Sequence, residues 1–354
     1  MSLSHPLRFT DNFHCAIWGG RNLADKLGKN LPPGDDYAES WEVVDHGADQ
    51  SVVAFGPLEG KTLAELRAED PAGLLGAKLA GADPPPSRFP LLFKFLDVQG
   101  LLSVQAHPDD ARAAQLDPPD FGKTEAWVIL DAAPGAKIYA GLKEGVTRKR
   151  LAEAVAAGET DTCLNPIQPS AGDCIFLPAG VCHAAGDGLL IAEIQQSSDT
   201  TYRLFDWNRV GADGRPRELQ VEQALEAIDY DFGPVSPHVE KPLVKERRGT
   251  ELVHCDKFTV NRYELSQWIA LGGDDRFRIL AVIEGAVSLV GDPAQRPLAL
   301  GQTALLPAGA GKVTVVPQGD AVVLEMFAPP ARTRAFRPSE SNRRKAPRAR
   351  GDRA

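Results

Sequence analysis

Residues 172–180 read "GDCIFLPAG", and this stretch decides the fold because it recurs in altered form as "GQTALLPAG" at residues 301–309. Both copies follow the pattern G-x5-P-x-G, in which apolar strand residues lie between a glycine turn and a proline-containing turn. Each copy is preceded by a pair of apolar runs, "AWVILDAAPGAKIYAGL" in the first and "RILAVIEGAVSLVG" in the second. The repeat predicts that the chain contains two versions of one β unit.

The remainder of the chain is rich in short β-like runs, which are broken by 33 glycines and 28 prolines. Many short strands with frequent turn residues indicate a mainly β protein of the sandwich or barrel type. Helices are expected as inserts in residues 61–81, 147–159 and 215–233. Thr62 and Glu65 have the spacing of a capping box at the start of the first insert.

The third predicted helix is expected to link the two β units. Its apolar face is made of Leu219, Ala224, Leu225 and Ile228. We expect a division into a catalytic unit with helical inserts (1–215), a linking helix (216–235), a second β unit (236–330) and a basic, disordered tail (331–354).

Composition narrows the class of protein. The chain has 354 residues, 43% of them hydrophobic and 25% charged, as is typical of a soluble globular protein. The net charge of -9 argues against a dedicated nucleic-acid binder, and no apolar run approaches the ~20 residues that span a bilayer. Five cysteines without a CxxC motif do not indicate a disulfide framework, and no signal peptide is evident. We expect a cytoplasmic protein without a nucleic-acid or membrane partner, as a monomer or weak homodimer.

The stretch "LLSVQAHPDD" at residues 101–110 contains an alternating polar row. In a strand, side chains at i and i+2 point to the same face, so Ser103, Gln105 and His107 share one face. The apolar residues between them point to the other face. Such a row is expected to hold a ligand inside the unit.

The two copies of the repeat differ three residues after their last glycine, where the first has His183 and the second has Lys312. The pattern G-x5-P-x-G-x2-H resembles the second motif of cupin jelly-roll barrels, in which the histidine binds a metal. The first cupin motif supplies H-x-H and a later glutamate, and here Gln105-x-His107 and Glu125 stand in those places. The resemblance implies two cupin-type jelly-roll barrels with helical inserts. It also implies a metal site in the first barrel and none in the second.

Two imidazoles and a carboxylate suit Zn²⁺ with open positions for substrate, and we expect one zinc per chain. The same ligands can bind Mn²⁺, Fe²⁺ or Co²⁺. The amide oxygen of Gln105 is a neutral ligand, which leaves more positive charge on the metal than a third imidazole would. This favours Lewis-acid chemistry.

Further segments resemble type I mannose-6-phosphate isomerases of the shorter, Bacillus-like branch: "FKFLD", "LSVQAHPDD", "GKTEAWVIL" and "LPAGVCHAAGDGLLIAEIQQSSDTTYRLFDWNR". This resemblance implies zinc-dependent interconversion of mannose 6-phosphate and fructose 6-phosphate. It places the metal on Gln105, His107, Glu125 and His183. It also implies a catalytic Arg203, from "TTYR", and active-site lysines Lys123 and Lys94. Tyrosine is common in the family where Phe205 or Trp207 stands here.

The implied reaction moves a proton between C2 and C1 of the sugar through an enediolate. Arg203 remains charged at any working pH, so it suits stabilisation of the oxyanion better than proton abstraction. The base stays open between Lys123, a hydroxide on the metal and Glu193.

The phosphate of such a substrate requires hydrogen-bond donors. The candidates are Arg203, Lys94, Lys123 and Ser103, and Lys94 can equally be an ordinary solvated lysine. Trp18 either lines the sugar pocket or belongs to the core.

Two other classes of function compete with the isomerase. Another cupin enzyme, such as a different sugar-phosphate isomerase or an iron oxygenase, can use His107, Glu125 and His183 in the same way. A non-catalytic sugar-phosphate sensor is the second alternative, although a regulator would be expected to have lost a ligand or the arginine.

Overall fold

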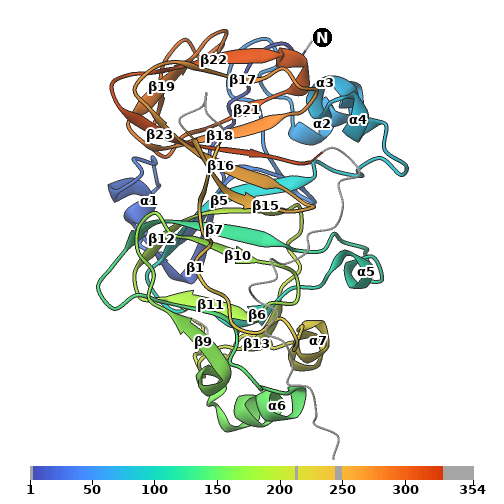
Figure 1. The fold of residues 1–354 in the computed structure, drawn as a ribbon, viewed down its shortest axis with the longest axis vertical. Coiled ribbons are helices and arrows are strands. Elements are labelled where there is room, and N and C mark those ends of the chain that lie inside the picture. The colour runs from blue at the N-terminus through green and yellow to red at the C-terminus, as the bar shows by residue number, and fades with distance from the viewer. Residues whose placement is uncertain (1–2, 212–213, 244–248, 330–354) are drawn as a thin grey trace, which may run out of the picture.

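The computed structural model describes residues 3–211, 214–243 and 249–329. Its main sheets lie one above another along the long axis of the molecule (Figure 1). The upper and lower halves each contain one six-stranded sheet and one smaller sheet.

The first unit has a six-stranded sheet in the spatial order β1 (Phe13–Gly20), β2 (Tyr37–Val43), β5 (Leu91–Val98), β12 (Leu189–Gln196), β7 (Glu125–Ala132) and β10 (Cys174–Leu177). Its smaller sheet has the order β13 (Tyr202–Phe205), β6 (Val104–Ala106), β11 (His183–Gly186), β8 (Lys137–Leu142) and β9 (Leu164–Ile167). A separate two-stranded ribbon is made of β3 (Asp45–His46) and β4 (Asp49–Gln50).

The second unit has a six-stranded sheet in the order β14 (Lys241–Pro242), β15 (Gly249–His254), β16 (Thr259–Leu265), β23 (Ala321–Phe327), β18 (Arg278–Glu284) and β21 (Thr303–Leu306). Its smaller sheet has the order β17 (Ile269–Gly272), β22 (Lys312–Pro317), β19 (Ala286–Leu289) and β20 (Leu298–Ala299). In each unit the two sheets face each other across an apolar core. The expected mainly β fold with two jelly-roll units is thereby confirmed.

The helical inserts are also confirmed. They are α1 (Asn22–Asp25), α2 (Leu63–Glu69), α3 (Pro71–Leu75), α4 (Ala77–Ala80), α5 (Asp110–Ala113), α6 (Arg148–Ala157) and α7 (Val221–Ala227), with 3-10 turns η1 (Thr160–Cys163) and η2 (Ala308–Ala310). Thr62 caps α2 through the predicted capping box with Glu65. The third helix is shorter than expected, because α7 begins at Val221. Leu219 therefore lies before the helix and is 41% exposed, which corrects its assignment to the buried face.

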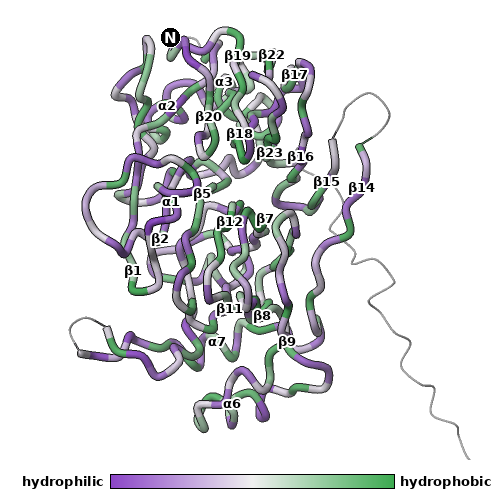
Figure 2. The backbone as a smooth tube through the Cα atoms, turned by 90° about the vertical axis from the view of Figure 1, so that its left-hand side faces the viewer, coloured by the Kyte–Doolittle hydropathy of each residue, from purple (hydrophilic) through white to green (hydrophobic). Residues whose placement is uncertain are grey.

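The two six-stranded sheets pack on each other, so the two units share a core. Every residue of β5 and β12 is buried, because one face of each strand points into the first unit and the other toward the second. Figure 2 shows hydrophobic stretches along β7 and β12 between the two units. This arrangement makes the strands that carry Lys94, Glu125 and Glu193 rigid supports.

The N-terminal part of the chain contributes to the second unit as well as to the first. Leu7 forms a β-bridge with Leu305, and the backbone N–H of Ala77 in α4 donates to Asp275 Oδ1 at 2.8 Å. Helices α2, α3 and α4 lie beside the second unit (Figure 1). The division at residues 215, 235 and 330 stays a prediction, and its predicted tail lies outside the described residues.

The sequence repeat corresponds to equivalent strands in the two units. The first copy forms β10 and leads into β11, and the second forms β21 and leads into β22. His183 and Lys312 are the first residues of β11 and β22; His183 is buried, and Lys312 is exposed. The helix α6 lies in the first unit between β8 and β9, as the sequence predicts.

All five cysteines are free, and Cys174 and Cys182 are buried. None of the helices in the described residues combines the length and the apolar character that crossing a bilayer requires.

Candidate metal centre and active site

Three side chains from three strands meet inside the first unit. Glu125 is the first residue of β7, His183 is the first residue of β11, and His107 directly follows β6. His183 Nε2 lies 3.1 Å from Glu125 Oε1, and His107 Nε2 lies 3.6 Å from Glu125 Oε2. Their candidate ligand atoms all lie within 4.8 Å of one another. The structure thus brings together three of the four predicted metal ligands.

Backbone carbonyls orient both imidazoles. His107 Nδ1 lies 3.0 Å from the carbonyl oxygen of Thr200, and His183 Nδ1 lies 2.9 Å from that of Val181. Donation from Nδ1 to a carbonyl leaves the lone pair on Nε2, which faces Glu125 in each case. This is the tautomer that metal-binding histidines use.

Most of the polar atoms that face one another in this cluster have no hydrogen-bond partner. Both carboxylate oxygens of Glu125 and Nε2 of His183 are buried without a hydrogen bond, and Oε2 of Glu125 has only the ion pair with Lys123 Nζ. Buried polar atoms are normally satisfied, and a shared cation satisfies a carboxylate and two imidazole lone pairs at once. The donor set therefore fits a divalent metal of the zinc type.

Electrostatics keep these groups in the protonation states that a metal requires. Burial opposes the ionisation of Glu125, but the charge of Lys123 and the two imidazoles outweigh it, so the pKa of this carboxyl lies well below its ordinary value. Burial and then the charge of Lys123 hold the pKa of His107 well below its ordinary value. An ionised carboxylate and a neutral imidazole are the ligand forms of these residues.

Gln105 is the fourth predicted ligand. In the smaller sheet it pairs with His183 on one side and with Arg203 on the other. Gln105 lines a cavity of about 370 Å³, whereas its neighbours Val104 and Ala106 lie in an apolar core. The predicted alternation along this strand is confirmed.

The same cavity collects most of the other residues expected at the site. Its polar and aromatic lining includes Trp18, Lys94, Ser103, Lys123, Glu193 and Arg203. Trp18 is 6% exposed and also packs in the core of the first unit, so both interpretations of this residue hold. Ser103 is buried beside Gln105 in the cavity wall.

Lys94 is buried, so the alternative that it is an ordinary solvated lysine is wrong. Only 6% of it is exposed, and its Nζ lies 2.9 Å from Glu39 Oε2 and 3.4 Å from Glu193 Oε1. Burial by itself lowers the pKa of Lys94, but the two neighbouring carboxylates have the larger effect. The pKa therefore lies above its ordinary value, and the lysine is held charged. Lys123 is placed on the cluster itself, 3.0 Å from Glu125 Oε2 and 3.3 Å from His107 Nε2.

Arg203 projects from β13 and donates through Nη1 to the carbonyl oxygen of Glu218 at 2.9 Å. Its Nε is buried without a partner, and within the described part of the chain it forms no ion pair. Asp206, which could have neutralised it, pairs instead with Arg209 and Arg217. Arg203 therefore presents a guanidinium without an ion-pair partner among the described residues at the cavity. Phe205 and Trp207, with ring centroids 5.6 Å apart, pack in the apolar cluster that contains Val104 and Ala106.

Three functional contributors escape sequence reasoning. Glu39 in β2 lines the cavity and accepts hydrogen bonds from Lys94 and from Trp41 Nε1, the latter at 2.6 Å. Arg217 lines it from a loop without a motif. Thr200 holds His107 through its backbone, which no side-chain pattern reveals. For Glu39 the available signal was its place in the stretch "ESWE", two residues before Trp41, which also resembles the family.

Family models agree with this geometry. Residues 7–128 match the model "Phosphomannose isomerase type I, catalytic domain", and residues 248–326 match "Mannose-6-phosphate isomerase, cupin domain". The first match contains Gln105, His107 and Glu125, and the second covers most of the second β unit.

Curated relatives and solved structures extend the similarity over most of the chain. Mannose-6-phosphate isomerase ManA of Bacillus subtilis is 36% identical over 320 residues, which are 90% of this chain and 98% of the relative. Mannose-6-phosphate isomerase of Streptococcus mutans is 34% identical over 308 residues, 86% of this chain and 93% of the relative. A crystal structure of the Bacillus subtilis mannose 6-phosphate isomerase superimposes with a TM-score of 0.80 at 31% identity, covering 91% of this chain and 99% of that one. The chain belongs to the type I phosphomannose isomerase family.

Proposed function

We propose that this protein interconverts D-mannose 6-phosphate and D-fructose 6-phosphate with one zinc ion held by Gln105, His107, Glu125 and His183. The observation that carries the proposal is the buried His107–Glu125–His183 cluster beside a cavity lined with lysine and arginine. A zinc ion bound there supplies Lewis-acid polarisation of the sugar oxygens. Family membership supports the choice of substrate.

The residues of this chain divide the remaining work. Arg203 is a cavity-lining guanidinium without an ion pair in the described chain, so it stabilises the negative charge that develops on the enediolate oxygen. Arg217 lies in the same cavity wall and adds a second guanidinium for the phosphate, although Asp206 partly neutralises it. Lys94 carries two carboxylate partners, and its role is to position Glu39 and Glu193 as much as to bind phosphate.

Glu193 has the properties of a proton acceptor at this site. It lines the cavity, and its Oε1 is buried without a hydrogen bond. Burial and the charge of Glu125 raise the pKa of Glu193, which strengthens it as a base. Lys123 and a hydroxide on the metal are the alternatives, but the Nζ of Lys123 already contacts two proposed metal ligands. We therefore favour Glu193 for the transfer between C2 and C1.

The direct test is conversion of mannose 6-phosphate to fructose 6-phosphate by purified protein, as prepared, after chelation, and after zinc is returned. We expect activity to disappear with chelation and return with zinc. If zinc-loaded, folded protein converts none of the substrate, the proposal is overturned. Oxygen consumption and conversion of other sugar phosphates in the same samples then distinguish an oxygenase from another isomerase.

A further inference from the structure

The segment between β12 and β13 contacts the candidate metal centre but belongs to neither strand. It comprises residues 197–201, and the carbonyl oxygen of Thr200 within it lies 3.0 Å from His107 Nδ1. The backbone hydrogen bonds of a sheet fix the direction of a carbonyl group, whereas an irregular segment needs other partners to do so. The orientation of His107 therefore depends on the groups that hold Thr200.

Asp120, in the loop that joins α5 to β7, holds this segment by two side-chain hydrogen bonds. Its Oδ2 accepts from Thr200 Oγ1 at 2.6 Å and from Ser198 Oγ at 2.9 Å. The hydroxyl oxygen of Ser198 in turn accepts from the backbone N–H of Thr200 at 3.3 Å. One carboxylate oxygen thus holds the side chain of Thr200 directly and its backbone by way of Ser198.

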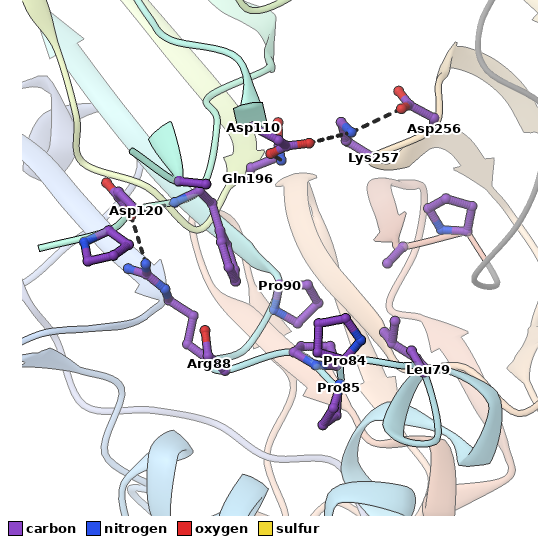
Figure 3. A pocket seen from close by; sticks show the side chains of 18 residues that line it. Leu79, Pro84, Pro85, Arg88, Pro90, Asp110, Asp120, Gln196, Asp256 and Lys257 are labelled. Carbon is purple, nitrogen blue, oxygen red and sulfur yellow. Dashed lines mark hydrogen bonds and ion pairs between the residues drawn. The ribbon is translucent and has the colours of Figure 1, made fainter. Parts of the chain in front are cut away.

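Asp120 is itself anchored by other parts of the first unit. Its Oδ1 lies 2.8 Å from Arg88 Nη2 in the wall of a cavity of about 800 Å³ that residues of both units line (Figure 3). Arg88 also lies over the ring of Phe121, 4.5 Å from its centroid. The backbone N–H of Asp120 donates to the carbonyl oxygen of Ala113 in α5 at 3.0 Å. Asp120 is therefore a fixed support, with both carboxylate oxygens engaged.

We propose that Asp120 is a positioning residue for the metal centre, which holds residues 198–200 so that the carbonyl oxygen of Thr200 accepts from His107 Nδ1. Donation from Nδ1 keeps the lone pair on Nε2, the nitrogen that faces Glu125. Asp120 acts through Thr200 rather than by touching the metal or the substrate. The inference rests on the zinc site of the proposed function and adds an outer support to it.

Packing of the rings is the competing support for His107. Its ring centroid lies 5.0 Å from that of His183, with the two planes inclined by 50°. A flip of the imidazole exchanges nitrogen and carbon positions while leaving the shape of the ring nearly unchanged, so packing alone does not select Nε2 for the metal. The hydrogen bond to Thr200 does select it. The two supports therefore predict different results when Thr200 loses its hydroxyl group.

The zinc affinity of the purified full chain, measured by competition with a chelating dye, tests the proposal. Thr200→Val keeps the carbonyl oxygen and the approximate shape of the side chain but removes the donor to Asp120. We expect its Kd for zinc to rise about tenfold, at the lower end of the effect of losing an outer support, because the carbonyl itself remains. Thr200→Ser retains a hydroxyl and should stay within about twofold of the parent.

Thr162→Val is the matched control. It removes a hydroxyl that donates to the carbonyl oxygen of Glu159 at 2.7 Å, at the start of η1, and it should leave the zinc affinity unchanged. An equal loss of affinity in Thr162→Val would overturn the proposal, because the loss would then follow general stability. Urea unfolding of the metal-free variants establishes that each one is folded.

A double-mutant cycle tests the link between the two residues. Asp120→Ala should weaken zinc binding at least as much as Thr200→Val, and Thr200→Val should add little in that background. Full additivity of the two changes would overturn the pairing.

The outcomes separate this inference from the zinc site on which it rests. A parent protein that binds no zinc overturns both. A parent that binds zinc, together with Thr200→Val of the same Kd, overturns only the role of Asp120.

Discussion

Glu125 and Arg278 occupy the same position in the two units, although they carry opposite charges. Glu125 pairs with Leu177, and Arg278 pairs with Leu306. The two leucines are equivalent, because each precedes the Pro-Ala-Gly of the repeated motif. The residue that completes the candidate metal cluster in the first unit is therefore a cation in the second.

The next strand continues the correspondence. Glu193 lies opposite Trp127, and Glu325 lies opposite Leu280, so the two glutamates are equivalent in the same frame. In the second unit Arg278 Nε donates to Glu325 Oε1 at 2.8 Å, and both residues are buried. One framework thus holds two carboxylates, Glu125 and Glu193, in the first unit and an arginine–glutamate ion pair in the second.

Glu325→Ala is predicted to destabilise the protein by about 3–5 kcal/mol, because it leaves the buried Arg278 with only the partly exposed Asp274 as a counter-charge and takes the acceptor from Asn261 and Tyr263. The measurement is urea unfolding near neutral pH. Glu264→Ala removes an exposed glutamate from the same sheet and is expected to stay within about 0.5 kcal/mol of the parent. Similar unfolding midpoints for the two variants would contradict a structural role for this pair.

His183→Ala is predicted to lose bound zinc and isomerase activity while keeping its fold, because the other two cluster residues no longer make a complete site. Zinc per chain, measured by elemental mass spectrometry, and circular dichroism test this directly. Lys312→Ala changes the equivalent residue of the second unit and should leave both zinc and activity unchanged. An unaltered zinc content in His183→Ala would refute the assigned ligands.

Arg203→Ala is predicted to lower kcat/KM by about 10²–10³-fold with zinc retained, because it removes charge stabilisation from the transition state. Arg203→Lys should recover part of the activity, since a point charge replaces the planar guanidinium. Steady-state kinetics on zinc-loaded protein provide the measurement. Arg148→Ala, on the exposed surface of α6, is the control. Full turnover by Arg203→Ala would remove this residue from the mechanism.

Asp120→Asn is predicted to weaken the protein in a pH-dependent manner. Burial opposes ionisation of Asp120, but hydrogen bonds from His46, Thr200 and Ser198 outweigh it, so its pKa lies well below the ordinary 3.8. The ionised side chain therefore stabilises the fold above about pH 3.8, and this contribution is lost as the pH falls below that value. We expect Asp120→Asn to cost about 1–3 kcal/mol at pH 7, because it disrupts buried hydrogen bonds.

The matching measurement for Asp120 is thermal unfolding of both proteins between pH 7 and pH 3. The gap in stability between parent and variant should narrow at the acidic end. A gap that is constant over this range would show that the charge of Asp120 does not contribute.

Local patterns in the sequence predicted the repeated β units, the face shared by Gln105 and Ser103, and the capping box of α2. These features depend on strand alternation and on turn or capping residues that are neighbours in the chain. The place of Arg217 in the cavity was not predicted, because it belongs to no motif with a known spacing, and no role was predicted for Glu39. Leu219 was misplaced for a related reason, since helical periodicity does not show where a helix begins.

The sequence by itself determined which ligand types are available, on which strands they lie and which repeat carries the histidine. Only the tertiary structure decided that Glu125 comes within 3.1 Å of His183, that Lys94 is buried between two carboxylates, and that Arg278 takes the place of Glu125 in the second unit. The physical reason is that side-chain alternation is a local property of a strand. Pairing between distant strands, by contrast, is set by the packing of whole sheets.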